Sequence, residues 1–266
     1  MASQIERILI LAKTYPSPSA QHVETSCVAG INEHGAMRRL YPMPFRLIEE
    51  GQKFKKWQWI DGRIEKANKD HRTESHKLYV DTITCGDVID TKKQWDARWP
   101  WIEKLPTFTS FDDLEANRIE TGLSLALMRP KQVLTLDIVE AKNAEWTDEE
   151  REKLLRCAMQ GQLFSDTEVK KMTQALRKVP FGFYYRYTCD TPEGEKVLKS
   201  WVKSWPCMER SQVRARRRGV IFRSAIISYT VQMLVIIHSS PRGVIDRLVK
   251  GVVNPSMSGA TPANGC

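Results

Sequence analysis

The fold is decided in residues 24–41, which read ETSCVAGINEHGAMRRLY. Two runs rich in β-forming residues, 24–31 and 36–41, are joined by four polar residues that end in Gly35. Glycine adopts a positive φ angle without steric cost, so this spacing predicts a β-hairpin with Gly35 in its turn. Pro42 and Pro44 end the second run, because proline cannot donate a hydrogen bond to a strand ladder.

Further strands are predicted on both sides of this hairpin. They are the runs 7–12, 54–64, 76–84, an apolar run at 133–139 and the aromatic run 181–189. Helices are predicted at 92–99, up to Pro100, from the N-cap Ser110 onward, at 147–159 and at 166–179. Strands therefore recur in two groups with helices between them, which favours two small β-barrels or sheets over a doubly wound α/β sheet.

Composition limits the class of protein. The chain has 266 residues, of which 41% are hydrophobic and 27% charged, so it can bury a sizeable core. It contains no apolar run of about 18 residues and no basic segment followed by an apolar one at its start. We therefore expect a cytoplasmic protein without a membrane partner. No glycine-rich phosphate-binding motif is present, so a P-loop or Rossmann site has no support.

Charge and cysteine content indicate the kind of partner. The formal net charge of +9 favours polyanions, above all DNA or RNA. The six cysteines are widely spaced and form no Cys-x-x-Cys pair, so we expect reduced thiols, no structural zinc and no other cofactor or metal.

Five linked segments occur in a fixed order in the first third of the chain. They are KTYPSPS (13–19), VETSCVAGI (23–31), RLYPMPFR (39–46), FKKWQWI (54–60) and DHRTESH (70–76). Together they resemble the bacterial dual OB-containing domain family, and FYYRYTCD (183–190) resembles its second half. The resemblance implies two OB-like barrels and nucleic-acid binding. Since OB barrels also bind oligosaccharides and peptides, the fold alone does not choose the ligand.

The predicted architecture is mainly β with intervening helices (α+β), built as two OB-like β-barrel units. Residues 1–90 form the first unit and 91–179 a helical and β connecting region that contributes to the second. Residues 180–240 form a diverged second unit, and 241–266 form a flexible C-terminal tail. The resemblance fades after Asp190, where an arginine cluster spans 210–223. Either the second barrel has diverged there, or the tail was altered, for example by a frame change in the gene.

Basic and aromatic residues interleave between residues 38 and 76, as single-strand binding requires: cations contact phosphates and aromatic rings stack on bases. The predicted nucleic-acid contacts are Arg38, Arg39, Tyr41, Arg46, Lys55, Lys56, Trp57, Trp59, Arg72 and His76. The competing interpretation places both tryptophans in the core and leaves the lysines as a solvated rim. The aromatic run 181–187 is interpreted as core packing, with a stacking surface as its alternative.

Two other functions remain open from the sequence. Asp70, Glu74 and His76 are candidate metal ligands or acid–base groups of an enzyme acting on a nucleic acid or nucleotide. The alternative interpretation of this segment is a structural loop in which Arg72 forms an ion pair with Glu74. The second alternative is a protein-interaction module that docks an operon-encoded partner. We expect a non-catalytic, nucleic-acid-binding accessory protein without sequence-specific readout, by analogy in DNA metabolism or prokaryotic defence.

Overall fold

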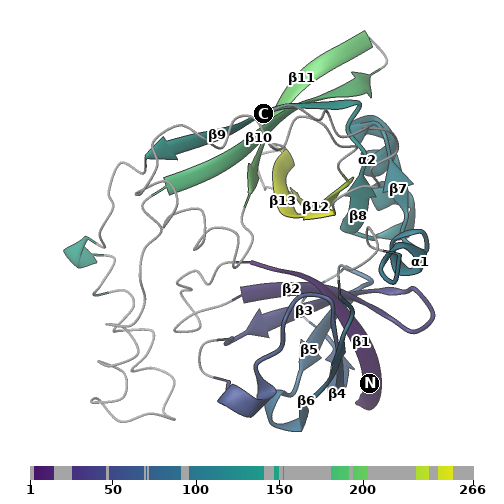
Figure 1. Cartoon of the computed structure of the whole chain (residues 1–266), viewed down its shortest axis with the longest axis vertical. Coiled ribbons are helices and arrows are strands. Elements are labelled where there is room, and N and C mark those ends of the chain that lie inside the picture. The colour runs from purple at the N-terminus through teal and green to yellow at the C-terminus, as the bar shows by residue number, and fades with distance from the viewer. Residues whose placement is uncertain are drawn as a thin grey trace, which may run out of the picture.

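The computed structural model describes residues 3–14, 26–45, 48–68, 70, 72–90, 96–140, 147–149, 152, 181–191, 194–202, 232–239 and 245–253. It has two β units, the first from the purple and blue part of the chain and the second from the teal, green and yellow part (Figure 1). Among the described residues, no helix combines the length and the apolar character needed to cross a membrane.

The first unit is a closed five-stranded barrel. Its strands are β1 (Gln4–Lys13), β2 (Ser26–Asn32), β3 (Met37–Met43), β4 (Gln58–Lys66) and β5 (Ser75–Leu78). They follow the order β1-β2-β3-β5-β4, and β1 also pairs with β4, which closes the ring. Only β3 and β5 run parallel. This is the five-stranded Greek-key arrangement of an OB barrel. Strand β6 (Thr84–Val88) pairs with β4, and short 3-10 turns lie at Glu50–Gln52 (η1) and Val80–Thr82 (η2).

The second unit begins after α1 (Trp99–Ile102). Its elements are β7 (Thr107–Phe108), α2 (Phe111–Thr121), β8 (Leu125–Met128), β9 (Gln132–Glu140), β10 (Phe181–Thr191), β11 (Gly194–Val202), β12 (Gln232–Ser239) and β13 (Ile245–Val253). The strand order is β7-β8-β12-β13-β11-β10-β9, and β11 and β13 run parallel.

The two units share one topology. In the second unit β8 pairs with β12 and β9 pairs with β10, while only residues 129–131, with Pro130 at their centre, separate β8 from β9. Together β8 and β9 therefore take the place of the first strand, which is split in two. In the first unit β1 fills this place alone, because it pairs with both β2 and β4. Strands β10, β11, β12 and β13 then take positions two, three, four and five. The expectation of a mainly β chain with two OB-like units is confirmed.

Strand β1 has apolar residues on both faces. Ile8 and Ile10 pack inside the first barrel with Val28 and Leu40, and all four are fully buried. Gly30 of β2 lies so close to β1 that an added Cβ would be 2.6 Å from the Leu9 carbonyl oxygen, so this contact requires glycine.

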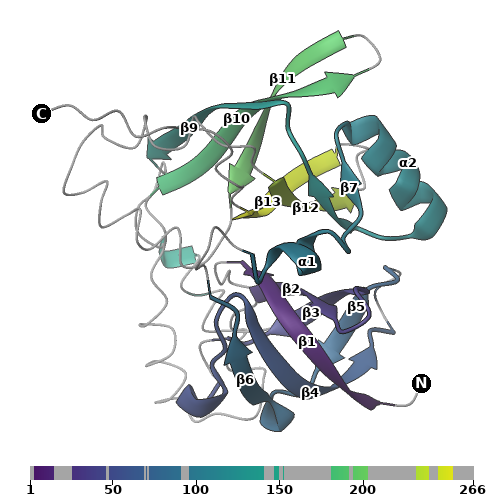
Figure 2. The same ribbon diagram turned by 45° about the vertical axis from the view of Figure 1, so that its right-hand side comes forward.

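One side of the first barrel is covered by α1 and by β8 of the second unit. Leu9, Ala29 and Ile31 form one buried cluster with Ile102 of α1 and Leu127 of β8. Figure 2 shows α1 between the first unit and the second. The α1–β8 segment therefore covers the side of β1 and β2 that faces away from the barrel interior, and β2 is buried on both faces.

Local signals predicted several features correctly. The 32–35 turn has Gly35 at φ 84°. Ser110 caps α2, accepting a hydrogen bond from the Asp113 N–H at 3.1 Å, and α2 ends at Gly122 with φ 72°. At Pro100, where the sequence predicts a break or a restart, helix α1 spans Trp99–Ile102, because proline is tolerated in a first helical turn. Residues 92–95 of that prediction lie outside the described residues.

Three segments differ from the expectation. The strand predicted at 76–84 is divided into β5, η2 and β6, because Thr82 Oγ1 donates to the Tyr79 carbonyl oxygen and accepts from the Arg63 N–H, which fixes a turn. The run 54–64 becomes a strand only from Gln58, since Trp57 has φ 61°. Strand β13 lies within residues 241–266, where a tail was expected.

The predicted helix 166–179 and the arginine cluster 210–223 lie outside the described residues, as does most of 147–159.

Candidate nucleic-acid interface

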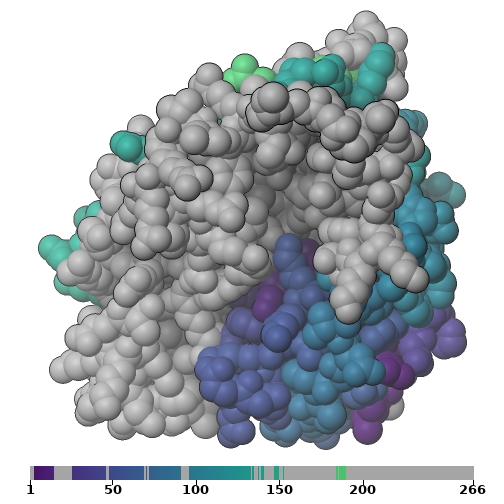
Figure 3. All heavy atoms as spheres, viewed as in Figure 1, coloured from purple at the N-terminus to yellow at the C-terminus, as the bar shows by residue number. Residues whose placement is uncertain are grey.

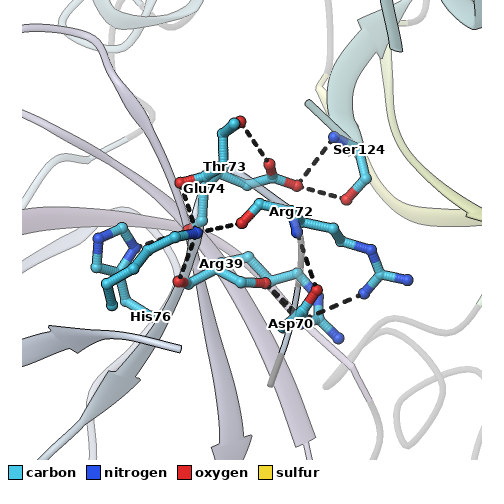
Figure 4. A network of polar contacts seen from close by, with 9 residues as sticks. Arg39, Asp70, Arg72, Thr73, Glu74, His76 and Ser124 are labelled. Carbon is cyan, nitrogen blue, oxygen red and sulfur yellow. Dashed lines mark hydrogen bonds and ion pairs between the residues drawn. The ribbon is translucent and has the colours of Figure 1, made fainter. Parts of the chain in front are cut away.

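The loop between β4 and β5 gathers the polar residues predicted from the 70–76 segment (Figure 4). The Lys66 ammonium, at the end of β4, donates to three carbonyl oxygens of residues 72–75 and so holds the loop in place. The polar side chains are therefore fixed against the barrel before any ligand arrives.

Arg39 of β3 is enclosed by this loop and is only 4% exposed. Its Nη1 donates to Asp70 Oδ2 at 2.7 Å and to Ser75 Oγ at 2.9 Å (Figure 4). Burial acts to raise the pKa of Asp70, but hydrogen bonds from Ser75 and the Arg72 N–H and the nearby guanidinium charges outweigh it, so the pKa lies below its ordinary value. Arg39 thus forms a buried ion pair, and its burial keeps it from a surface phosphate.

Glu74 joins the two units. It is 1% exposed, and its Oε1 accepts hydrogen bonds from the N–H of Ser124, at 2.9 Å, and from the Ser124 hydroxyl. Ser124 directly precedes β8 in the second unit. Arg72 Nη1 lies 3.5 Å from Asp70 Oδ2, whereas the structural-loop interpretation paired Arg72 with Glu74. Glu74 is therefore a buried structural acceptor between the barrels.

The two tryptophans belong to the core. Trp57 and Trp59 are 6% and 8% exposed and lie in the cluster shared by both units. Trp101 of α1 packs edge-on against Trp59 with ring centroids 4.9 Å apart, and the Arg98 guanidinium lies 4.8 Å from the Trp57 ring centroid. Both rings are covered by protein, so the core interpretation replaces base stacking for these residues. Tyr41 is partly buried at the same cluster, with the Arg39 guanidinium 4.6 Å from its ring centroid.

Arg38 is held by an acid that the sequence did not suggest. Its Nε and Nη2 donate to the two carboxylate oxygens of Glu6, each at 2.7 Å, and Asn32 donates to the same carboxylate at 2.8 Å. Burial acts to raise the pKa of Glu6, but these hydrogen bonds lower it below its ordinary value. This two-bond ion pair between Arg38 and Glu6 links β3 to β1. It occupies the guanidinium N–H groups that would otherwise donate to a phosphate.

The remaining predicted contacts lie nearer the surface. Lys55 is exposed and Lys56 half-buried, in the turn that leads into β4. His76 is half-buried, and its Nδ1 donates to the Glu74 carbonyl oxygen at 2.9 Å. Burial lowers the pKa of His76 below its ordinary value, and the charges of Arg38 and Lys66 act in the same direction. Arg46 lies outside the described residues. The structure therefore brings Arg39, Arg72 and His76 to one loop and places Lys55 and Lys56 elsewhere.

The same loop was the candidate for metal binding. In the part of the chain that the structure describes, no three His, Cys, Asp or Glu side chains are placed to hold a metal ion together. Asp70 is engaged by Arg39, and Glu74 by Ser124. The geometry therefore gives no support to acid–base or metal chemistry at these residues.

Sequence reasoning missed Glu6, Ser124 and Lys13. The partners Arg38 and Glu6 are separated by 32 residues, and Glu74 and Ser124 by 50, so no local pattern connects them. Lys13 carried a weak signal, since it directly follows the apolar run 7–12 and continues β1 into a buried position.

Two family models match adjacent parts of the chain. Residues 4–104 match Domain of unknown function (DUF8758), and residues 107–225 match Domain of unknown function (DUF8757). The boundary between the matches falls between α1 and β7. Two adjacent domains therefore divide most of the chain, in agreement with its two β units.

Chains of solved structures are similar to this protein. No curated protein matches the chain. A chain from "Structure and Conformational Change of a Replication Protein A Heterotrimer Bound to ssDNA" is similar, with a TM-score of 0.27 and 8% sequence identity. The match covers 96% of this chain and 66% of that chain, so this protein spans just under two thirds of its length.

Proposed function

We propose that this protein binds nucleic acid, single-stranded or structured, without sequence-specific readout. The observation that supports this most is the repeated OB strand order, with parallel third and fifth strands in both units and a closed ring of five strands in the first. OB barrels present a strand face and loops to oligonucleotides or oligosaccharides. The net charge of +9 favours the polyanion among these ligands.

Lys55 and Lys56 are the cations of the first barrel that best fit this function. Lys55 is exposed, and the structure gives its ammonium neither a hydrogen bond nor an acidic partner among the described residues. Lys56 adds positive potential to the same turn, because its charge contributes to the lowered pKa of the neighbouring Lys13. Two cations side by side attract phosphate groups and release counterions when they bind them.

The test is fluorescence anisotropy of labelled single-stranded DNA, single-stranded RNA and duplex DNA over a salt series. We expect binding that weakens as salt rises. The double variant Lys55→Ala, Lys56→Ala should reduce the slope of log K against log salt by about 1.4, since each lost single-strand phosphate contact removes about 0.7.

The control has the same charge change at another place. Arg63 of β4 and Lys77 of β5 are both exposed, and their cations lie 4.3 and 4.7 Å from the Tyr79 ring centroid. Arg63→Ala, Lys77→Ala should leave the salt slope close to that of the unaltered protein. Absence of binding to all three probes at low salt would overturn the proposed function, and an equal effect of both double variants would remove Lys55 and Lys56 from the interface.

A further inference from the structure

The 54–57 turn carries the two cations of the proposed interface, and it is tied to β1 at both of its ends. At its start, Lys13 Nζ donates to the Phe54 carbonyl oxygen at 2.7 Å. At its end, the Trp57 N–H donates to the Ile10 carbonyl oxygen at 2.6 Å. Trp57 has φ 61°, which is costly for a bulky side chain and persists only where the surroundings fix it. The turn is therefore held against β1, and Lys13 is one of its two anchors.

Lys13 is a buried amine that faces no negative charge. It is 6% exposed, and its Nζ lies 3.6 Å from the ring centroid of Phe45 and 5.3 Å from that of Phe54. No acid of the described ranges forms an ion pair with it. The titratable groups that act on it are Lys56, in the turn, and Cys85, on β6. Burial raises the pKa of Cys85, so its thiol is neutral near pH 7.

These surroundings keep the Lys13 amine close to its titration point. Burial, together with the smaller effect of the Lys56 charge, lowers the pKa of Lys13 from 10.5 to about 7. A phosphate that contacts Lys56 would offset the positive charge there and bring a negative charge to the same side of Lys13. A nearby opposite charge favours the protonated form of an amine. Phosphate binding at the turn and protonation of Lys13 should therefore favour each other.

A ligand can reach the turn while Lys13 stays covered. Lys55 is exposed and Lys56 is half-buried, whereas Lys13 is buried. Figure 3 shows blue spheres of the chain around η1, which precedes the turn, at the surface of the first unit. A phosphate therefore meets the two cations of the turn and acts on Lys13 through its charge, without contact.

We propose that the protein takes up a proton when it binds a phosphate group of a nucleic acid at the 54–57 turn, and that the Lys13 amine holds this proton. The amine gains the proton from solvent, and no covalent bond to the ligand forms. This inference rests on the proposed function and adds a regulation of the same site. Because the bound state holds more protons, affinity rises as the pH falls from about 9 to about 6.

The first experiment measures affinity over this pH range at constant salt, by anisotropy. The probe is a labelled oligodeoxyadenylate without a terminal phosphate, because its phosphodiesters and adenines do not titrate there. Binding should weaken about tenfold as the pH rises, since each pH unit by which a ligand shifts the titration of one group changes affinity tenfold.

Three variants assign the proton to Lys13. Lys13→Met should bind equally at every pH, with the affinity that the unaltered protein has near pH 9. Any binding that remains in Lys55→Ala, Lys56→Ala should also be independent of pH. Arg63→Ala, Lys77→Ala is the charge-matched control and should keep the full pH dependence. A pH dependence that persists in Lys13→Met would overturn the inference, because another group would then hold the proton.

A second measurement uses only the unaltered protein. Titration calorimetry in buffers of different ionisation enthalpy counts the protons taken up on binding. Near pH 7.5 we expect about half a proton for each bound oligonucleotide, the uptake that corresponds to the tenfold change in affinity. Binding without proton uptake would overturn the role of Lys13 and leave the proposed function intact. Absence of binding at every pH would overturn both proposals.

Discussion

Lys13 is a buried cation at the end of β1. It is 6% exposed, its Nζ donates to the Phe54 carbonyl oxygen at 2.7 Å, and it lies 3.6 Å from the centroid of the Phe45 ring. Burial lowers the pKa of Lys13 from 10.5 to about 7, and the charge of Lys56 acts in the same direction. An ammonium in such a place is destabilising, because desolvation is only partly offset by one hydrogen bond and an aromatic face.

The lowered pKa of Lys13 makes stability depend on pH. Between about pH 7 and 10 the unfolded chain holds the Lys13 proton and the folded chain does not, so the free energy of unfolding rises with pH in this window. Lys13→Met removes this rise in the free energy of unfolding, which amounts to at most about 1.4 kcal/mol per pH unit. The stability of the Lys13→Met variant, relative to the unaltered protein, should therefore be greatest near pH 7 and decline toward pH 10. Urea unfolding over a pH series measures this, and a difference that does not vary with pH would contradict it.

At the scale of elements, the β4–β5 loop and the start of β8 depend on each other through Glu74. The carboxylate satisfies the backbone N–H and the hydroxyl of Ser124, and all these groups are buried. A buried donor that loses its acceptor costs about 1–3 kcal/mol. The contact therefore joins a loop of the first barrel to the interrupted first strand of the second.

Loss of the Glu74 carboxylate should destabilise the whole chain. We expect Glu74→Ala to lower the free energy of unfolding by about 2–4 kcal/mol, because two buried donors lose their acceptor. Glu74→Gln retains a carbonyl oxygen and should cost less. Chemical denaturation measures both. In the presence of Ser124→Ala the effect of Glu74→Ala should shrink; full additivity would show that the two residues act independently.

At the scale of the molecule, one buried cluster joins the two barrels. Leu127 of β8 lies in the cluster shared with β2, whereas its neighbour Met128 contacts Cys189 within the second unit. Both are fully buried. The Leu127 side chain therefore supports both barrels, whereas the Met128 side chain supports the second barrel.

Leu127→Ala tests the shared core. We expect it to lower the free energy of unfolding by about 2–5 kcal/mol, as a large-to-small change in a packed core does. Hydrogen exchange should increase in β2, which belongs to the other unit. Met128→Ala is the matched control and should increase exchange mainly in the second unit. Equal exchange of β2 in the two variants would show that the barrels are stabilised separately.

The sequence alone determined the features that depend on neighbouring residues. The hairpin at 24–41, the turn at Gly35, the cap at Ser110 and the aromatic strand at 181–189 all follow from backbone preferences of a few adjacent residues. The division into two β units also followed, because strands recur in two groups. The resemblance added OB-like barrels, and the strand order agrees.

Tertiary structure alone decided which faces are covered and which cations are available. Nothing near Arg38 or Arg39 in the chain shows that Glu6 and Asp70 bind them, and β2 is buried on both faces only because a segment more than 70 residues away packs on it. The sequence left both base stacking and core packing open for Trp57 and Trp59, and contact with α1 decided for the core. The physical reason is that burial and ion pairing are properties of surfaces brought together by the fold, whereas turns and strands express the local energetics of the backbone.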